Sequence, residues 1–189
     1  MPVEEFIDEP PTFAPLREEY ANLLDALDKC GSVVISGPDD FAGILTPMDV
    51  IRYQERVTGE FLDLQQVEHA VRWLIRRSVP DDLDLQAVID TGLSEKYVDK
   101  ARPRNLEDMS FDDYVCIVRD GRTYDRFSHA FGENRCLAAY KLEQARDIRN
   151  IVFHFRRPLD DPERLTLRQL RIWLLRCRHK VDARKEAAR

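Results

Sequence analysis

Apolar residues in the last third of the chain repeat with the spacing of a helix that is packed on one side. They recur at steps of three or four residues: Ala138, Leu142, Ala145, Ile148, Val152 and Phe155. Such spacing gathers them on one face of an α-helix and places Arg146, Asn150 and His154 on another face, one turn apart. Pro158 disfavours helical backbone in the residue before it, so we expect the helix to end near Arg156.

The same periodicity predicts further helices on both sides of this one. An apolar stripe from Phe61 to Ile75 predicts a helix that stops before Pro80. Short helices are expected over 83–89 and 94–101, and a longer one after Ser110. A final helix should begin with Asp161 as its N-cap and bury a stripe every three or four residues. The members of that stripe are Leu167, Leu170, Leu174, Cys177 and Val181.

The first third of the chain follows a different pattern. Residues 1–15 are rich in proline and acidic side chains, which predicts an extended arm. A short helix over 20–30, ended by Gly31, precedes two short β-branched or aromatic strands, 33–36 and 41–45, with a turn at 37–40 between them. A helix over 47–57 completes an α-β-β-α unit. We therefore predict an α+β protein with a small unit over 16–58, a boundary at Gly59 and a helical bundle over 60–189.

Charge is distributed unevenly along the 189 residues. The net charge is −6, but residues 1–134 hold 14 Lys or Arg against 28 Asp or Glu, whereas residues 135–189 hold 15 against 7. Two interpretations are open: the basic helices meet an anionic ligand or partner, or the two halves attract each other within the fold. The row formed by Arg164, Arg168, Arg171 and Arg178 has two interpretations of its own, a track for phosphates or a solvated helix face.

Composition also bears on the cellular compartment of the protein, on the state of its cysteines and on whether it needs a cofactor. No stretch approaches the ~20 apolar residues of a membrane span, and the acidic N-terminus is no signal peptide, so we expect a cytoplasmic protein without membrane contact. Four cysteines, Cys30, Cys116, Cys136 and Cys177, lie far apart within apolar patterns, so we expect reduced, buried side chains. No metal or other cofactor is implied, because the carboxylates do not cluster with the histidines at ligand spacing.

One motif lies at the end of the amphipathic helix. The run from Arg149 to His154 reads Arg-Asn-Ile-Val-Phe-His. It resembles the signature of the HEPN superfamily, an arginine, a polar residue, three residues and a histidine near the end of the third main helix of a small helical bundle. Many prokaryotic ribonucleases and toxins belong to this superfamily, and two such helices face each other across a dimer. A common toxin subfamily has Tyr two residues after the histidine, where this chain has Arg156.

The resemblance implies metal-independent RNA cleavage by a homodimer, leaving a 2′,3′-cyclic phosphate. His154 would transfer protons, Arg149 would stabilise the scissile phosphate and Asn150 would orient one of them. Flanking phosphates of the RNA would be held by Arg146, Arg156 and Arg157. Structural roles are the alternative: Arg149 would pair with an acid such as Asp147 or Asp112, and His154 would be a satisfied histidine near the core.

A second motif precedes the boundary. Gly43-Ile44-Leu45-Thr46-Pro47-Met48-Asp49 resembles one CBS motif, a family whose adenosine-binding members use the matching Thr and Asp to contact ribose or phosphate. That resemblance implies an adenine nucleotide at Thr46 and Asp49, with a second chain completing the module. The same residues also form a helix N-terminal capping box, with Thr46 as the N-cap.

The sequence therefore leaves two hypotheses. The first is a HEPN-type endoribonuclease used in growth arrest or phage defence and restrained by nucleotide binding to the CBS-like unit. The second is a non-catalytic regulator that senses a nucleotide or binds RNA or a protein.

Overall fold

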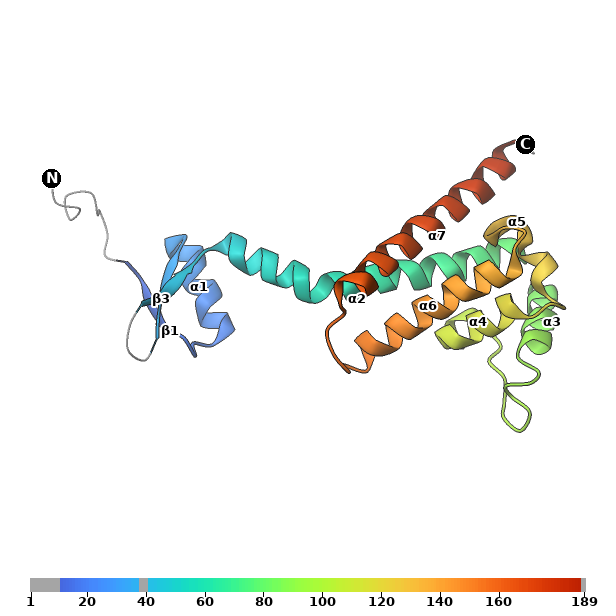
Figure 1. Ribbon diagram of the computed structural model, residues 1–189, viewed down its shortest axis with the longest axis horizontal. Coiled ribbons are helices and arrows are strands. Elements are labelled where there is room, and N and C mark those ends of the chain that lie inside the picture. Colours follow the sequence, from blue (N-terminus) through green and yellow to red (C-terminus); the bar gives the residue numbers. More distant parts are fainter. Residues whose placement is uncertain (1–10, 38–40, 188–189) are drawn as a thin grey trace. The chain divides into compact units, whose positions relative to one another are not determined.

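The computed structural model describes residues 11–37 and 41–187, and the chain divides into two compact units, 1–59 and 60–189 (Figure 1). A small three-stranded sheet lies in the N-terminal unit, and the rest of the described chain is mainly helical. The predicted α+β class is confirmed at this level. The boundary that we expected at Gly59 falls at the division between the units.

The N-terminal unit consists of β1 (Phe13–Pro15), α1 (Tyr20–Cys30), β2 (Val33–Ser36) and β3 (Phe41–Leu45), followed by the start of α2 (Pro47–Ser78). Helix α1 and strands β2 and β3 have the predicted bounds. Gly31 ends α1 in a left-handed conformation, with φ of 71°, which glycine adopts without steric cost. The predicted turn at 37–40 lies partly outside the described residues.

A third strand, which was not predicted, extends this sheet. β1 pairs in parallel with β2, which pairs antiparallel with β3, in the order β1-β2-β3. The backbone N–H of Val34 donates to the Thr12 carbonyl at 2.9 Å, and that of Leu16 donates to the Ser36 carbonyl at 3.0 Å. The prediction of an extended arm over 1–15 is therefore wrong for 13–15, and residues 1–10 lie outside the described part. Ala14, Leu27 and Val33 form the small buried core of this unit.

Helix α2 runs without interruption from Pro47 to Ser78. The prediction of two helices separated at Gly59 is thus wrong, although the predicted stop before Pro80 is confirmed. A glycine in a helix interior costs only about 0.5–1 kcal/mol relative to alanine. Good helix formers lie nearby on both sides, among them Glu55 and Leu62, and can offset that cost, so Gly59 does not break the helix.

The C-terminal unit contains the rest of α2 and five further α-helices, with two short 3-10 helices between them. Their bounds are α3 (Asp82–Gly92), η2 (Leu106–Asp108), α4 (Phe111–Arg119), η3 (Tyr124–Arg126), α5 (Ser128–Phe131), α6 (Arg135–Phe153) and α7 (Asp161–Ala187). The expected helix over 94–101 is absent from this described segment, which forms turns and bends. The N-cap of α7 is Asp160 instead of Asp161, because Asp160 Oδ1 accepts from the Glu163 backbone N–H at 2.8 Å.

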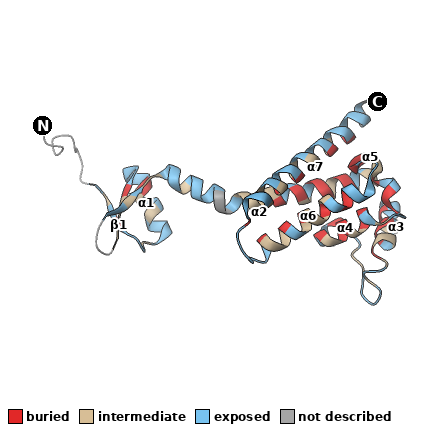
Figure 2. Cartoon of the chain, viewed as in Figure 1, coloured by how far each residue is buried: buried red, intermediate tan, exposed pale blue. Residues whose placement is uncertain are grey.

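Figure 2 shows the buried faces of these helices turned toward one another. Both predicted inward stripes are buried: five of the six positions on α6, and all five on α7. Phe155 is the exception, with 82% of its surface exposed. Its backbone φ is 50°, in the left-handed region. The chain therefore leaves the helical path before Phe155, and that side chain cannot continue the stripe.

Ion pairs join the acidic and basic parts of the chain within this unit. Arg164 Nε lies 2.9 Å from Glu60 Oε1, and Arg171 Nη1 lies 2.8 Å from Asp63 Oδ1, so both arginines tie α7 to α2. The Arg178 guanidinium lies over the Trp73 ring, 4.8 Å from its centroid. Of the arginine row on α7, only Arg168 has no such contact within the described residues, and the other three contact side chains of α2.

The prediction that the cysteines are buried is wrong for Cys30 and Cys136 and holds only in part for Cys116. All four are free, but Cys30 and Cys136 are exposed, Cys116 is partly buried, and only Cys177 is buried. Cys30 is the last residue of α1, and Cys136 lies in the first turn of α6, two residues before the buried Ala138. Two residues correspond to more than half a helical turn, which moves Cys136 away from the core stripe.

Gly59, inside α2, and Gly31, which caps the end of α1, predict opposite effects of substitution by alanine. A Cβ on Gly59 would have no atom within 4 Å, so Gly59→Ala should raise the unfolding free energy by about 0.5–1 kcal/mol. Gly31→Ala should lower it by about 1–2 kcal/mol, because alanine is strained at a positive φ. Urea unfolding followed by far-ultraviolet circular dichroism measures both. A Gly59→Ala variant less stable than wild type would contradict the continuous helix.

Candidate functional site

The predicted site lies where α6 ends. The helix stops at Phe153, three residues earlier than expected, and His154 is its C-cap, with φ of −93° and ψ of 8°. The backbone N–H of Arg156 donates back to the Ile151 carbonyl at 3.1 Å, and that of Phe155 donates to the Val152 carbonyl at 3.1 Å. These bonds hold the turn, and His154 is exposed on it.

Arg149 is held by an aromatic ring. Its guanidinium carbon lies 4.8 Å from the centroid of the Phe153 ring. Phe153 in turn makes an edge-to-face contact with Phe61 of α2, with ring centroids 5.5 Å apart. Arg149 Nε is buried and has no hydrogen-bond partner in the described part of the chain. Because Nε is buried, a phosphate oxygen could approach this stacked cation only at its two amino groups, which have no hydrogen bond or ion pair among the described residues.

The acids that we considered as partners of Arg149 bind Arg146 instead. Arg146 Nη1 lies 3.0 Å from Asp112 Oδ1, and its Nη2 lies 2.9 Å from Asp147 Oδ1. Asp112 also contacts Lys96 Nζ at 2.6 Å. Burial of Asp112 alone would raise the pKa of its carboxyl, but the hydrogen bonds from Lys96 and Arg146 outweigh burial and lower it. Arg146 therefore links α6 to α4, and Arg149 is left without an acid.

Arg157 also forms an ion pair within the fold. Its Nη1 and Nη2 each lie 2.7 Å from a carboxylate oxygen of Glu163, a bidentate pair that closes the turn between α6 and α7. The hydrogen bonds from Arg157 lower the pKa of Glu163 to about 2, and the backbone N–H of Asp160, 2.9 Å away, acts in the same direction. Arg156 is exposed and has no ion pair among the described residues. Of the three arginines expected to hold flanking phosphates, only Arg156 is therefore available as it stands.

Neither His154 nor Asn150 has a hydrogen-bonded side chain within the described residues, and Asn150 is partly buried. The structure therefore does not join Arg149, Asn150 and His154 by hydrogen bonds. It presents one exposed imidazole and one guanidinium without an acid partner at the end of the same helix. A single chain thus supplies one group suited to proton transfer at this site.

Thr46 and Asp49 form the capping box at the start of α2. The Thr46 backbone N–H donates to Asp49 Oδ2 at 3.0 Å, and its hydroxyl donates to the same oxygen at 2.6 Å. These bonds from the Thr46 side chain and backbone lower the pKa of Asp49. A cavity of about 420 Å³ between α1 and α2 has mainly apolar walls, among them Leu24 and Val50, and neither residue of the box lines it. This arrangement favours the capping interpretation.

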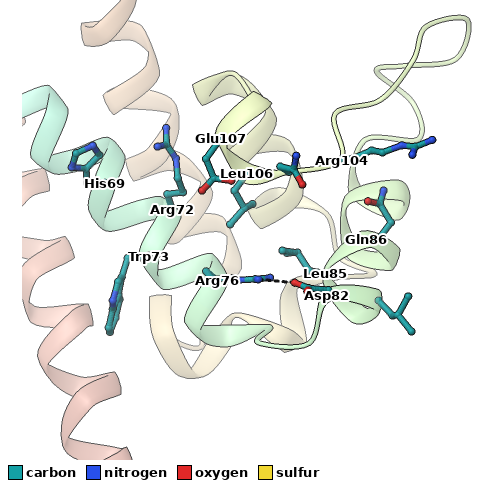
Figure 3. A pocket seen from close by; sticks show the side chains of 12 residues that line it. His69, Arg72, Trp73, Arg76, Asp82, Leu85, Gln86, Arg104, Leu106 and Glu107 are labelled. Carbon is teal, nitrogen blue, oxygen red and sulfur yellow. Dashed lines mark ion pairs between the residues drawn. The ribbon is translucent and has the colours of Figure 1, made fainter.

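A larger cleft in the C-terminal unit was not predicted from the sequence. It has a volume of about 790 Å³ and lies between α2 on one side and α3 with residues 104–107 on the other (Figure 3). Arg72 and Arg76 contribute from α2, and their spacing of four residues was the one local signal that could have suggested a basic helix face. The opposite wall could not be predicted, because it depends on how the chain folds back after α3.

Comparison with known proteins supplies no relative: no family model, curated protein or solved structure matches the chain. Over residues 11–37 and 41–187, no three His, Cys, Asp or Glu side chains are grouped so as to hold a metal ion. None of the described helices is both long enough and apolar enough to cross a membrane. The fold and the candidate site describe an α+β protein with an exposed histidine, and an arginine without an acid partner among the described residues, near the end of one helix.

The ion pair beside the site predicts a pH-dependent stability. The pKa of Glu163 is about 2 in the folded chain against an ordinary 4.5. The pair therefore stabilises the fold above pH 4.5, and this stabilisation is lost as the pH falls from 4.5 through about 2. Arg157→Gln should raise the pKa of Glu163 toward its ordinary value in an NMR titration of the carboxyl carbon. Arg168→Gln is the matched control and should leave it unchanged; an unaltered Glu163 titration in Arg157→Gln would contradict the assignment.

Proposed function

We propose that this chain is a metal-independent endoribonuclease of HEPN type that acts as a homodimer. The observation that carries the proposal lies at the end of α6: His154 is exposed, and the guanidinium of Arg149 is stacked on the Phe153 ring and has no acid partner among the described residues. Arg146 and Arg157 instead form ion pairs within the fold, with Asp112 and Glu163. An imidazole and an unneutralised guanidinium are the two groups that metal-free cleavage of a ribose-phosphate linkage requires.

The reaction assigned to these groups is an internal transesterification. A base removes the proton from the 2′-hydroxyl, whose oxygen attacks the adjacent phosphorus. The bond from phosphorus to the 5′-oxygen breaks, and an acid protonates that oxygen as it leaves. The products are a 2′,3′-cyclic phosphate and a 5′-hydroxyl end. Arg149 stabilises the charge that develops on the non-bridging oxygens.

Two copies of the chain are part of the proposal. The base and the acid act on opposite sides of one phosphorus, and one chain supplies one imidazole at this site. Twofold pairing of the α6 ends would provide a second His154 and a second Arg149. The exposed aromatic side chain of Phe155, next to His154, offers a face on which a base of the RNA can stack.

The N-terminal unit would serve as the regulatory part. Its β-α-β-β-α order and the Thr46-Pro47-Met48-Asp49 run support the CBS resemblance. Because Thr46 and Asp49 bond to each other, binding of an adenine nucleotide there would have to displace bonds of the capping box. A role in growth arrest or phage defence follows from the HEPN resemblance, since a cell that carries such a ribonuclease would need it restrained.

The proposal predicts cleavage that depends on His154. Purified protein should cut transfer RNA or messenger RNA in the presence of EDTA and leave 2′,3′-cyclic phosphate ends. His154→Ala should slow this cleavage by about 10²–10⁴-fold, the usual contribution of a general acid or base. The measurement is the rate of product formation on end-labelled RNA resolved by gel electrophoresis.

His179→Ala provides the matched control, because His179 is an exposed histidine on α7, away from the signature run. It should retain the wild-type rate. Uncut RNA across a range of substrates, together with a salt-sensitive gel shift that survives in His154→Ala, would replace the enzyme with the second hypothesis, a non-catalytic RNA-binding regulator.

A further inference from the structure

We infer that the cleft between α2 and α3 is a binding site for one nucleotide, that is, for a base and ribose carrying a phosphate. The site is separate from the end of α6, since neither Arg149 nor His154 lines it. Its volume of about 790 Å³ falls within the range of small-molecule sites, about 300–1,000 Å³. The inference does not depend on cleavage of RNA by His154.

The phosphate would be held by arginines from both walls. Arg76 extends across the cleft toward Asp82, with Nη2 2.6 Å from Oδ1 (Figure 3). The Asp82 side chain is 82% exposed and that of Arg76 is 48% exposed, so breaking this pair costs little. Arg104, at the outer side of the cleft, has no ion pair or hydrogen bond within the described residues. Two guanidiniums can therefore turn to a phosphate and hold it in bidentate fashion.

A third arginine is fixed in place. Arg72 Nε donates to the Tyr114 hydroxyl at 3.0 Å, and its Nη2 lies 2.7 Å from Glu68 Oε1. These two bonds leave its remaining amino group free of any bond in the described chain. Arg72 is already paired with Glu68, so what it adds is one N–H donor group at a defined position, which need not reorganise when a ligand binds.

The rest of the lining suits a nucleoside. Leu85 and Leu106 are buried and give the cleft an apolar floor against which a flat ring can pack. The side-chain amides of Gln86 and Asn105 border the same space. Each donates one N–H to an aspartate, to Asp90 at 3.3 Å and to Asp108 at 3.2 Å, and its amide oxygen can accept from the polar edge of a base. Glu107 is exposed and can accept hydrogen bonds from ribose hydroxyls. Inorganic phosphate alone would contact neither the apolar floor nor the two amides, so the lining favours a whole nucleotide.

Titration calorimetry of the full-length chain tests this inference, with adenosine 5′-monophosphate as the probe and adenosine and inorganic phosphate as partial probes. We expect saturable binding of the monophosphate and at least tenfold weaker binding of either part. Arg104→Gln alone should weaken binding, and Arg76→Gln with Arg104→Gln should weaken it at least tenfold. Both variants should keep the wild-type melting temperature, because neither side chain is buried.

Two controls locate the site. Arg168→Gln with Arg176→Gln removes two exposed arginines of α7 that have no ion pair in the described chain, and it should bind like wild type. Thr46→Val with Asp49→Asn tests the N-terminal unit. Binding that is lost in this second variant but kept in the Arg76/Arg104 variant would overturn the inference, as would the absence of saturable binding.

A further titration distinguishes a free nucleotide from a nucleotide within an RNA strand. A short single-stranded oligoribonucleotide is titrated into the His154→Ala protein, which cannot cut it if the proposed function holds. Binding tighter than that of the monophosphate, and again weakened by the Arg76/Arg104 substitutions, would assign the cleft to one nucleotide of an RNA. Equal affinity would assign it to a free nucleotide. RNA that binds with no effect of these substitutions would count against the cleft, whatever the cleavage assay shows.

Discussion

The bidentate ion pair between Arg157 and Glu163 is the interaction on which the candidate site depends. It closes the turn between α6 and α7, and the capping bonds between Asp160 and Glu163 anchor that turn to the first turn of α7. α6 ends at Phe153, before this turn, and His154 follows as its exposed C-cap. Exposure of the imidazole is therefore a consequence of how the two helices are joined.

A related constraint separates the arginines of this region into two groups. Acidic side chains lie within reach of Arg146 and Arg157, whereas Arg149 faces an aromatic ring. Paired arginines contribute to the fold and would have to give up an acid before binding RNA. Arg149 would give up only a stacking contact, or none at all, since a ring and a phosphate can contact one guanidinium together. This difference in available charge is the strongest argument that the turn serves a purpose beyond packing.

Local signals in the sequence predicted much of the architecture. Helix α1 with Gly31, strands β2 and β3, and the buried stripes of α6 and α7 depend on neighbouring residues, and their predictions are confirmed. Strand β1 was missed because it exists only through pairing with β2, and Gly59 was misread because its context overrides its propensity. Two features could not be predicted from local patterns: that the neighbouring acids pair with Arg146 and not with Arg149, and that a cleft forms near Arg72. Both arise from contacts between helices.

The central claim is that two chains together supply the imidazoles for one cleavage event. Mixing wild type with His154→Ala, under conditions in which subunits exchange, tests it directly at constant total protein. If both copies of His154 serve each site, a half-and-half mixture should retain about one quarter of the activity of undiluted wild type, since only dimers of two wild-type chains can act. Activity that falls in simple proportion to the wild-type fraction, to about one half, would contradict the claim, because each chain would then work alone.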